Sequence, residues 1–206
     1  MKIINLIAKS KMYTANVFFV HGSWNAIDDV NTLVDVGRDP AVIESINEVS
    51  SGVGKKRVDQ VILTHSHYDH SSLLPVIRNI FDPVVYAFSS YIKGIDHILE
   101  DGDKIKIGDE MFEVLCTPAH SSDSICLYCE KEGILFAGDT PVLIRSPDGT
   151  SGHNFIQNLE KLCSGNICKI YFGHGDTITE GCRELIYESL RNIRKSGLKK
   201  KVLACP

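Results

Sequence analysis

Several features that define other classes of protein are missing from this chain of 206 residues. No apolar run approaches the length of a membrane span. The N-terminal segment is interrupted too early by Lys9 and Lys11 to serve as a signal peptide. No repeat, low-complexity tract or linker divides the sequence. These absences predict one globular domain over residues 1–206, located in the cytoplasm and independent of membranes.

An excess of positive charge is also lacking. The chain has 22 Lys and Arg residues and 26 Asp and Glu residues, for a formal net charge of −4. A mildly acidic chain has no general attraction for nucleic acid, so a small-molecule partner is expected instead. The one basic cluster is interpreted as a solvated helix end and tail; it comprises Arg191, Arg194, Lys195, Lys199, Lys200 and Lys201.

The seven cysteines form no recognisable disulfide framework, because their number is odd and the domain is large enough to fold without staples. Reduced, partly buried thiols are therefore expected. Cys126 and Cys129 form a CxxC pair inside a strand-like run. Residues three apart on a strand point to opposite faces, so a metal shared by these two thiols is not expected.

What the sequence does contain is a recurring pattern of short apolar runs that end at an acidic residue or a histidine. Such runs, bounded by turn-forming residues, predict buried strands. Polar groups just beyond strand ends are well placed to build one site on a rigid scaffold. The five runs lead to Asp35, His65, His120, Asp139 and His174.

Segments with helical periodicity lie between these strands, and serines or threonines near the start of some of them suggest N-terminal caps. A short strand, Lys104–Ile107, is expected between turns at Gly102-Asp103 and Gly108-Asp109. The pattern predicts two β-sheets covered by helices. The expected helices are Ala41–Val49, Ser71–Ile80 with Ser71 and Ser72 as caps, Asn154–Cys163, and Thr179–Arg194 with Thr179 as a cap.

The densest chemical signal is the segment His65-Ser66-His67-Tyr68-Asp69-His70, which holds three of the eight histidines. Clustering imidazoles without a ligand is costly, because each ring must give up solvation. Neutral imidazole and carboxylate together suit zinc, iron or manganese. The segment therefore predicts a metal site.

His65-x-His67-x-Asp69-His70 resembles the signature motif of the metallo-β-lactamase superfamily. The flanking sequences of four further residues resemble the other motifs of that family, in the same order, over most of the chain. These are Asp35 in Leu33–Gly37, His120 in Thr117–Ser121, Asp139 in Phe136–Thr140 and His174 in Phe172–Asp176. The resemblance implies an α/β (α+β) fold, an αββα sandwich of two mixed β-sheets flanked by helices.

The resemblance also implies a role for each of these residues. One metal ion would be bound by His65, His67 and His120, and a second by Asp69, His70 and His174. Asp139 would bridge the two ions, which are expected to be zinc, with iron or manganese as alternatives. Asp69, His70 and Asp139 are expected to act in catalysis, and Asp35 to hold the histidine loop from behind the ligands.

The implied activity is hydrolysis of a small ester, a thioester (as in glyoxalase II) or a lactone. Ala119 and the pair Ser71-Ser72 stand where the family often has glycine, so altered loop shapes are expected. Two alternatives stay open. One is an iron-dependent redox enzyme like the flavodiiron proteins or the persulfide dioxygenases, and the other is a non-catalytic metal-binding module. Metal content distinguishes zinc hydrolysis from iron chemistry.

Substrate contacts are the least constrained part of the prediction. Arg145 and His153 lie in the loop Pro141–Asn154, which follows the bridging aspartate, and could meet an anionic substrate. His21 and Trp24 lie in the first hairpin, which in this family often overhangs the site. His97 is expected at the surface. The sequence leaves the substrate, the metal and a homodimeric state open.

Overall fold

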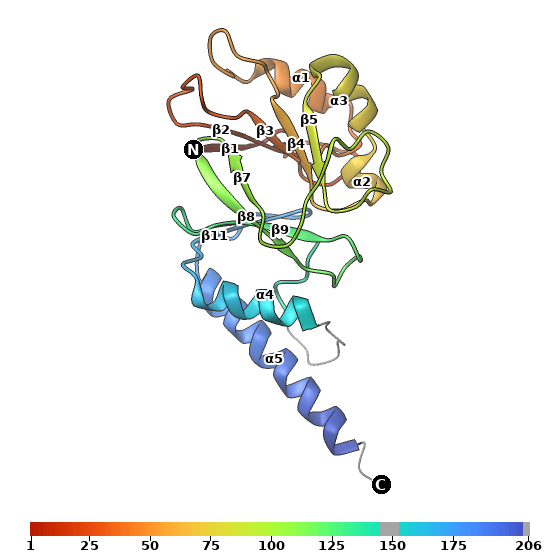
Figure 1. Cartoon of the computed structure of the whole chain (residues 1–206), viewed down its shortest axis with the longest axis vertical. Coiled ribbons are helices and arrows are strands. Elements are labelled where there is room, and N and C mark those ends of the chain that lie inside the picture. The colour runs from red at the N-terminus through yellow and green to blue at the C-terminus, as the bar shows by residue number, and fades with distance from the viewer. Residues whose placement is uncertain (145–152, 204–206) are drawn as a thin grey trace.

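The computed structural model describes residues 1–144 and 153–203 (Figure 1). Two sheets are stacked face to face. The first has the order β1-β2-β3-β4-β5-β6 and the second the order β11-β10-β9-β8-β7. The first sheet comprises β1 (Lys2–Asn5), β2 (Phe18–His21), β3 (Thr32–Val34), β4 (Gln60–Leu63), β5 (Val84–Ala87) and β6 (His97–Ile98). The second comprises β7 (Lys104–Ile107), β8 (Glu110–Cys116), β9 (Ile125–Cys129), β10 (Ile134–Gly138) and β11 (Lys169–Phe172).

Helices cover the outer face of each sheet (Figure 1). α1 (Ala41–Glu48), α2 (Tyr68–Ser71) and α3 (Leu74–Phe81) lie on the first sheet, and α4 (His153–Ser164) and α5 (Cys182–Leu203) lie on the second. Both sheets mix parallel and antiparallel pairs. The predicted αββα sandwich is therefore confirmed. Within the described ranges, none of the helices combines the length and apolar character needed to cross a membrane.

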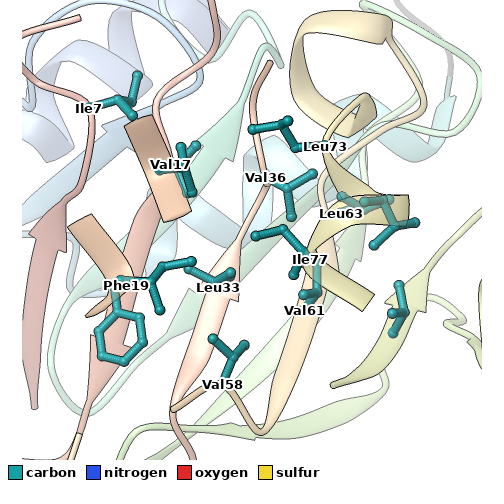
Figure 2. Packing of buried hydrophobic residues seen from close by; sticks show 14 of the residues in the cluster. Ile7, Val17, Phe19, Leu33, Val36, Val58, Val61, Leu63, Leu73 and Ile77 are labelled. Carbon is teal, nitrogen blue, oxygen red and sulfur yellow. The ribbon is translucent and has the colours of Figure 1, made fainter. Parts of the chain in front are cut away.

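Alternating side chains divide the interior into three hydrophobic layers. Val61 and Leu63 of β4 face the helices of the first half, whereas Ile62 between them packs between the two sheets. Leu135 and Phe136 of β10 divide in the same way between α4–α5 and the inter-sheet layer. Figure 2 shows the first of these layers, where residues of the strands meet those of the segment that carries α3. Period-two alternation in fully buried strands requires this four-layered packing.

The cysteine pair of β9 follows the same alternation. Cys126 packs in the layer beneath α4 and α5, and Cys129 packs between the sheets. The two thiols therefore lie on opposite faces of the sheet, as the spacing predicts. Burial raises the pKa of the Cys126 thiol to about 11, so this side chain is a neutral core residue at physiological pH.

Strand direction places the site at one end of the sandwich. β3 and β4 run parallel. In the second sheet β9 is antiparallel to both β8 and β10, and β11 is parallel to β10, so β8, β10 and β11 share one direction. The chain leaves each of these five strands just before a predicted site residue. Their carboxyl ends meet at one edge of the two sheets, where the residues that follow them lie close together.

Two predicted helix starts are wrong. Hydrogen bonds of Ser71 and Ser72 explain the first, and the backbone conformation of Gly181 explains the second. Ser71 ends α2 instead of capping a longer helix, because its hydroxyl donates back to the carbonyl oxygen of His67 at 3.0 Å. Ser72 Oγ donates to the carbonyl oxygen of Gly37 at 3.2 Å, and α3 begins only at Leu74. α5 begins at Cys182 and not near Thr179, because Gly181 adopts a φ of 63°, outside the helical region.

Candidate metal centre

The loop after β4 carries four of the predicted ligands, and one turn of helix shapes it. The backbone N–H groups of His70 and Ser71 both donate to the carbonyl oxygen of His67 at 3.1 Å. This turn forms α2 and brings the ring of His70 back to that of His65. The rings of His65 and His70 lie 4.1 Å apart between centroids, and those of His65 and His67 lie 4.6 Å apart.

Residues from the second sheet complete three overlapping groups of potential ligand atoms. In each group, every atom lies within 4.8 Å of the others. The groups are His65, His67 and His120; His65, His70 and Asp139; and Asp69, His70 and His174. The structure thus brings together all seven residues of the predicted ligand set. Asp139 lies between the two outer groups, with Oδ2 3.5 Å from His120 Nε2 and 3.6 Å from His174 Nε2.

The donor atoms are arranged as metal ligands would be. Nε2 of His65, His70 and His174 is buried and makes no hydrogen bond of normal geometry, although Asp69 Oδ2 lies 3.0 Å from His174 Nε2. His67 Nδ1 and His120 Nε2 face each other at 2.9 Å. Buried polar atoms without partners are costly, and a cation between them would satisfy their lone pairs. The residues present therefore fit one or two metal ions.

Asp35 holds His70 from behind. Its Oδ2 lies 2.8 Å from Nδ1 of His70, while its Oδ1 accepts the backbone N–H of Thr64 and its Oδ2 also accepts the Thr64 hydroxyl. Asp35 adopts a φ of 59°, a left-handed conformation that is uncommon outside glycine and costs stability. This strained conformation places the carboxylate next to Nδ1 of His70, on the side of the ring opposite Nε2.

The electrostatics of the buried groups follow from these contacts. Burial alone would lower the pKa of His70, but the charges of Asp35 and Asp139 raise it to about 10. Burial and the neighbouring His70 lower the pKa of His65 to about 4, which leaves its ring neutral and ready to bind a metal. Burial opposes ionisation of Asp139, yet His70, His174 and His65 lower its pKa to about 2. Asp139 is therefore a carboxylate at neutral pH.

One glycine lets the second sheet approach the ligands. A Cβ atom at Gly173 would lie 2.2 Å from Asp139 Oδ1 and 2.5 Å from His70 Cε1. Both distances are shorter than side-chain contacts allow, so only glycine fits between Phe172 and His174. The backbone N–H of Gly173 donates to the carbonyl oxygen of Gly138 at 2.8 Å, which ties the ends of β10 and β11 together.

The model of the metallo-beta-lactamase superfamily matches residues 13–93 and 88–151 of this sequence. The chain belongs to the metallo-β-lactamase superfamily. Every residue of the site except His174 falls within the matched segments.

Individual members of the superfamily resemble the chain over most of its length. A hydroxyacylglutathione hydrolase of Hydrogenovibrio crunogenus is 31% identical over 181 residues, which are 84% of this chain and 63% of that protein. A beta-lactamase domain protein of Burkholderia ambifaria has the same fold, with a TM-score of 0.68, 20% identity, and coverage of 95% of this chain and 71% of that one. Rubredoxin oxygen:oxidoreductase of Desulfovibrio gigas gives a TM-score of 0.66 at 16% identity, over 86% of this chain and 53% of that one.

The predicted substrate contacts fare differently from the ligands. His21 is wrongly placed by the prediction: it is buried in β2, and its Nδ1 lies 2.6 Å from Asn25 Oδ1. β2 is antiparallel to β3, so Phe18 pairs with Val34 near the site and His21 lies at the opposite end of the sheet. Trp24 follows it there and is exposed. Arg145 lies outside the described residues, and of His153 only its place as the first residue of α4 is described.

The segment that does flank the site is one that the sequence prediction missed. Tyr13 is 71% exposed, and its ring stacks on that of His174 with centroids 5.2 Å apart and an interplanar angle of 14°. Arg38 lies over the ring of Tyr68, which separates His67 from Asp69 in the chain. No sequence pattern marks Tyr13 or Arg38. Tyr68 alone could have been noticed, because it sits inside the metal-binding motif of the superfamily.

A cavity of about 300 Å³ opens beside the ligands. A wider groove of about 710 Å³ lies between α4 and α5, but none of the clustered histidines lines it. The smaller cavity is the stronger candidate for substrate, because chemistry and not size identifies a site in this superfamily. Its walls include His120, Asp139, Pro141, Leu143, Phe172 and His174.

Proposed function

We propose that this protein is a metal-dependent hydrolase that cleaves a small thioester at a dinuclear site. The observation that carries the proposal is the set of three overlapping ligand groups, to which seven side chains contribute donor atoms. His65, His67 and His120 would hold one ion, and Asp69, His70 and His174 the other. Asp139 lies within reach of both groups and would be shared.

When bound, two divalent ions, zinc in this proposal, would polarise the substrate carbonyl and supply a nucleophile at neutral pH. The protein's own contribution is to hold the donor atoms in place before substrate arrives. Asp35 accepts the Nδ1 proton of His70 and directs Nε2 into the site. The carboxylate of Asp139 offsets positive charge at the centre of the histidine cluster, where burial strengthens every electrostatic interaction.

A thioester suits this site because its leaving group needs little help. Hydrolysis adds water across the bond, so the acyl carbon gains oxygen, the C–S bond breaks and one proton is released with the two products. A thiol has a pKa of about 8.5, so a thiolate can depart without a strong acid beside it. The hydroxyacylglutathione hydrolase named above acts, by its name, on a glutathione thioester, and its 31% identity supports the same class of substrate here.

Redox chemistry at a pair of iron ions is the second candidate function. Rubredoxin oxygen:oxidoreductase of Desulfovibrio gigas shares the fold of this chain, which is the observation behind this candidate, and the likeness is one of fold alone. The histidine ligands do not decide between the two functions, because three imidazoles around one position suit zinc as well as iron. Metal analysis of the purified protein separates the two, since zinc supports hydrolysis and iron supports oxygen chemistry.

The experiment that tests the proposal combines metal content with turnover. Native protein is analysed for zinc, iron and manganese and then assayed with thioester, lactone and phosphodiester substrates. His67→Ala and Asp139→Ala are expected to lose metal and thioesterase activity together. Asp28→Ala is the control, because Asp28 is exposed and pairs with Lys106 away from the site. Full metal content and full turnover in both site variants would show that the assignment is wrong.

A further inference from the structure

Arg38 lies next to the segments that carry the metal ligands. Among the residues that the structure describes, none forms an ion pair with the guanidinium of Arg38 or accepts a hydrogen bond from it. The guanidinium lies over the ring of Tyr68, whose centroid is 5.3 Å from Cζ. An arginine stacked on an aromatic ring keeps its five N–H donors free and pre-oriented for a planar anion.

Backbone contacts fix Arg38 to the segments that carry the ligands. Its N–H donates to Thr14 Oγ1 at 2.9 Å, and the N–H of the preceding Gly37 donates to the carbonyl oxygen of His70 at 3.0 Å. Ala15, in turn, donates to the carbonyl oxygen of Asp69 at 3.1 Å. Three separate segments are thus tied into one rim beside the group formed by Asp69, His70 and His174.

Two exposed aromatic rings belong to the same rim. Tyr13 and Tyr68 are 71% and 68% exposed, respectively. Each ring contacts a polar neighbour, His174 for Tyr13 and Arg38 for Tyr68, and otherwise faces solvent. Large exposed rings next to an unpaired cation are typical of a surface that covers a ligand, with the rings supplying apolar area and the cation supplying orientation.

We propose that Arg38, supported by Tyr68 and flanked by Tyr13, binds a carboxylate carried by the substrate, so that the preferred substrates are thioesters with an anionic arm. The inference rests on the proposed function for the substrate's reacting group. The new element is a binding site for a part of the substrate that lies outside the metal centre. A single guanidinium matches a carboxylate through two parallel hydrogen bonds. A phosphate arm would use the same donors, and the experiment separates the two sources.

The first test is direct binding, which does not depend on turnover. Glutathione and its dimethyl ester are titrated calorimetrically into metal-loaded wild-type protein and into Arg38→Met. Loss of one charged hydrogen-bonded contact is expected to weaken binding of the free acid by about tenfold or more. Binding of the ester is expected to change little. Arg57→Met is the matched control, because Arg57 precedes β4 and lies at the end of that strand away from the site.

Steady-state kinetics then assign the contact to the reaction. With acyl-glutathione, Arg38→Met is expected to raise KM by about tenfold with little change in kcat, because the contact is remote from the reacting bond. Tyr68→Leu is a second variant, which keeps the arginine but removes its support, and is expected to raise KM less. Tyr13→Ala is expected to raise KM alike for free acid and ester, since its contribution is apolar.

Three results would overturn the inference. If Arg38→Met binds glutathione as tightly as wild type does, Arg38 does not contact the carboxylate. If the variant loses the same affinity for glutathione and for its dimethyl ester, the arginine has a structural role. If Arg38→Met raises KM for an acyl-coenzyme A but not for acyl-glutathione, the arginine contacts phosphate and not a carboxylate. If no thioester is hydrolysed but glutathione still binds through Arg38, the proposed function fails while the carboxylate contact stands.

Discussion

Asp35 Oδ2 and His70 Nδ1 lie 2.8 Å apart in the interior of the molecule, where the two side chains are 3% and 0% exposed. The contact joins the end of β3 to the one-turn helix α2 and determines which nitrogen of the ring is left for the metal. An imidazole whose Nδ1 proton is held by a carboxylate presents its Nε2 lone pair in a fixed direction. The geometry of the candidate metal centre therefore depends on a residue outside the set of candidate ligands.

Asp35→Asn tests this dependence. Asparagine tolerates the left-handed conformation at this position, so the backbone is expected to survive the change. Its amide cannot accept from both Thr64 and His70 as the carboxylate does. Metal affinity, measured by competition with a chromogenic chelator, is expected to fall by about 10-fold to 100-fold. The control is Asp39→Asn, which loses a hydrogen bond from Ser10 in a surface loop and should bind metal normally.

Removal of the metal should lower thermal stability. A ligand that binds only the folded state at about 100 times its Kd stabilises by about 2.7 kcal/mol. For a domain of this size that corresponds to a fall of roughly 5–10 °C in Tm when a chelator is added. The measurement is a thermal melt with zinc and with chelator, for wild type and for His67→Ala. If the variant responds to zinc as strongly as wild type does, His67 is not a ligand.

Gly173→Ala should damage the site by close contact alone. The added methyl would lie 2.2 Å from Asp139 Oδ1, so the carboxylate or the end of β11 must move. Metal affinity and turnover are expected to fall by about tenfold or more, comparable to loss of an outer contact. Gly102→Ala is the control: at its φ of 90° alanine is strained, but the new Cβ meets nothing within 4 Å. This control should lose stability and keep metal binding.

The comparison of Asp35 with His21 shows what the sequence could predict. Both residues follow a short apolar run. The run before Asp35 is one of the five that predict the site, whereas His21 is expected near the site because the first hairpin of the family often overhangs it. Asp35 lies there because β3 points its carboxyl end towards the site, whereas β2 runs antiparallel to β3 and carries His21 away from it. Strand direction depends on pairing between distant segments, which local pattern does not contain. The family motifs supply that missing information for the ligands, whereas the usual place of the family's first hairpin predicts the wrong end of the sheet for His21.

Contacts made across long stretches of chain escaped prediction for the same reason. Tyr13 and His174 are 161 positions apart in the sequence. They meet because Asn16 donates through its backbone N–H to the carbonyl oxygen of Gly173 at 2.6 Å.

The layers of the core were predictable, since alternation in β4 and β10 follows from strand geometry. Helix starts were less predictable. The hydroxyl of Ser71, for example, donates to the carbonyl oxygen of His67 and does not cap the turn that follows.

Glu113 provides a test of pH dependence away from the metal. This residue of β8 is 14% exposed, and its carboxylate pairs with Lys104 of β7 at 3.0 Å and with Lys161 of α4. Burial alone would raise the pKa of Glu113, but the hydrogen bonds and charges of Lys161 and Lys104 lower it below the ordinary value. The ion pairs thus hold α4 against the second sheet only while the carboxylate is ionised.

The sign of the pH effect follows from that lowered pKa. A carboxyl group with a lower pKa in the folded state stabilises the fold above its ordinary value of 4.5, and this contribution is lost as pH falls through the lowered folded value. Glu113→Gln is therefore expected to cost about 0.5–1 kcal/mol at pH 7, a modest amount because both lysines are partly exposed. The deficit relative to wild type should shrink as pH falls below 4.5 and should disappear once pH is below the lowered folded pKa. Urea titrations of both proteins at several pH values measure it, with Glu48→Gln on the exposed face of α1 as the control. A deficit of constant size from pH 7 to pH 3 would mean that the lost interaction is not the ion pair but packing of the side chain.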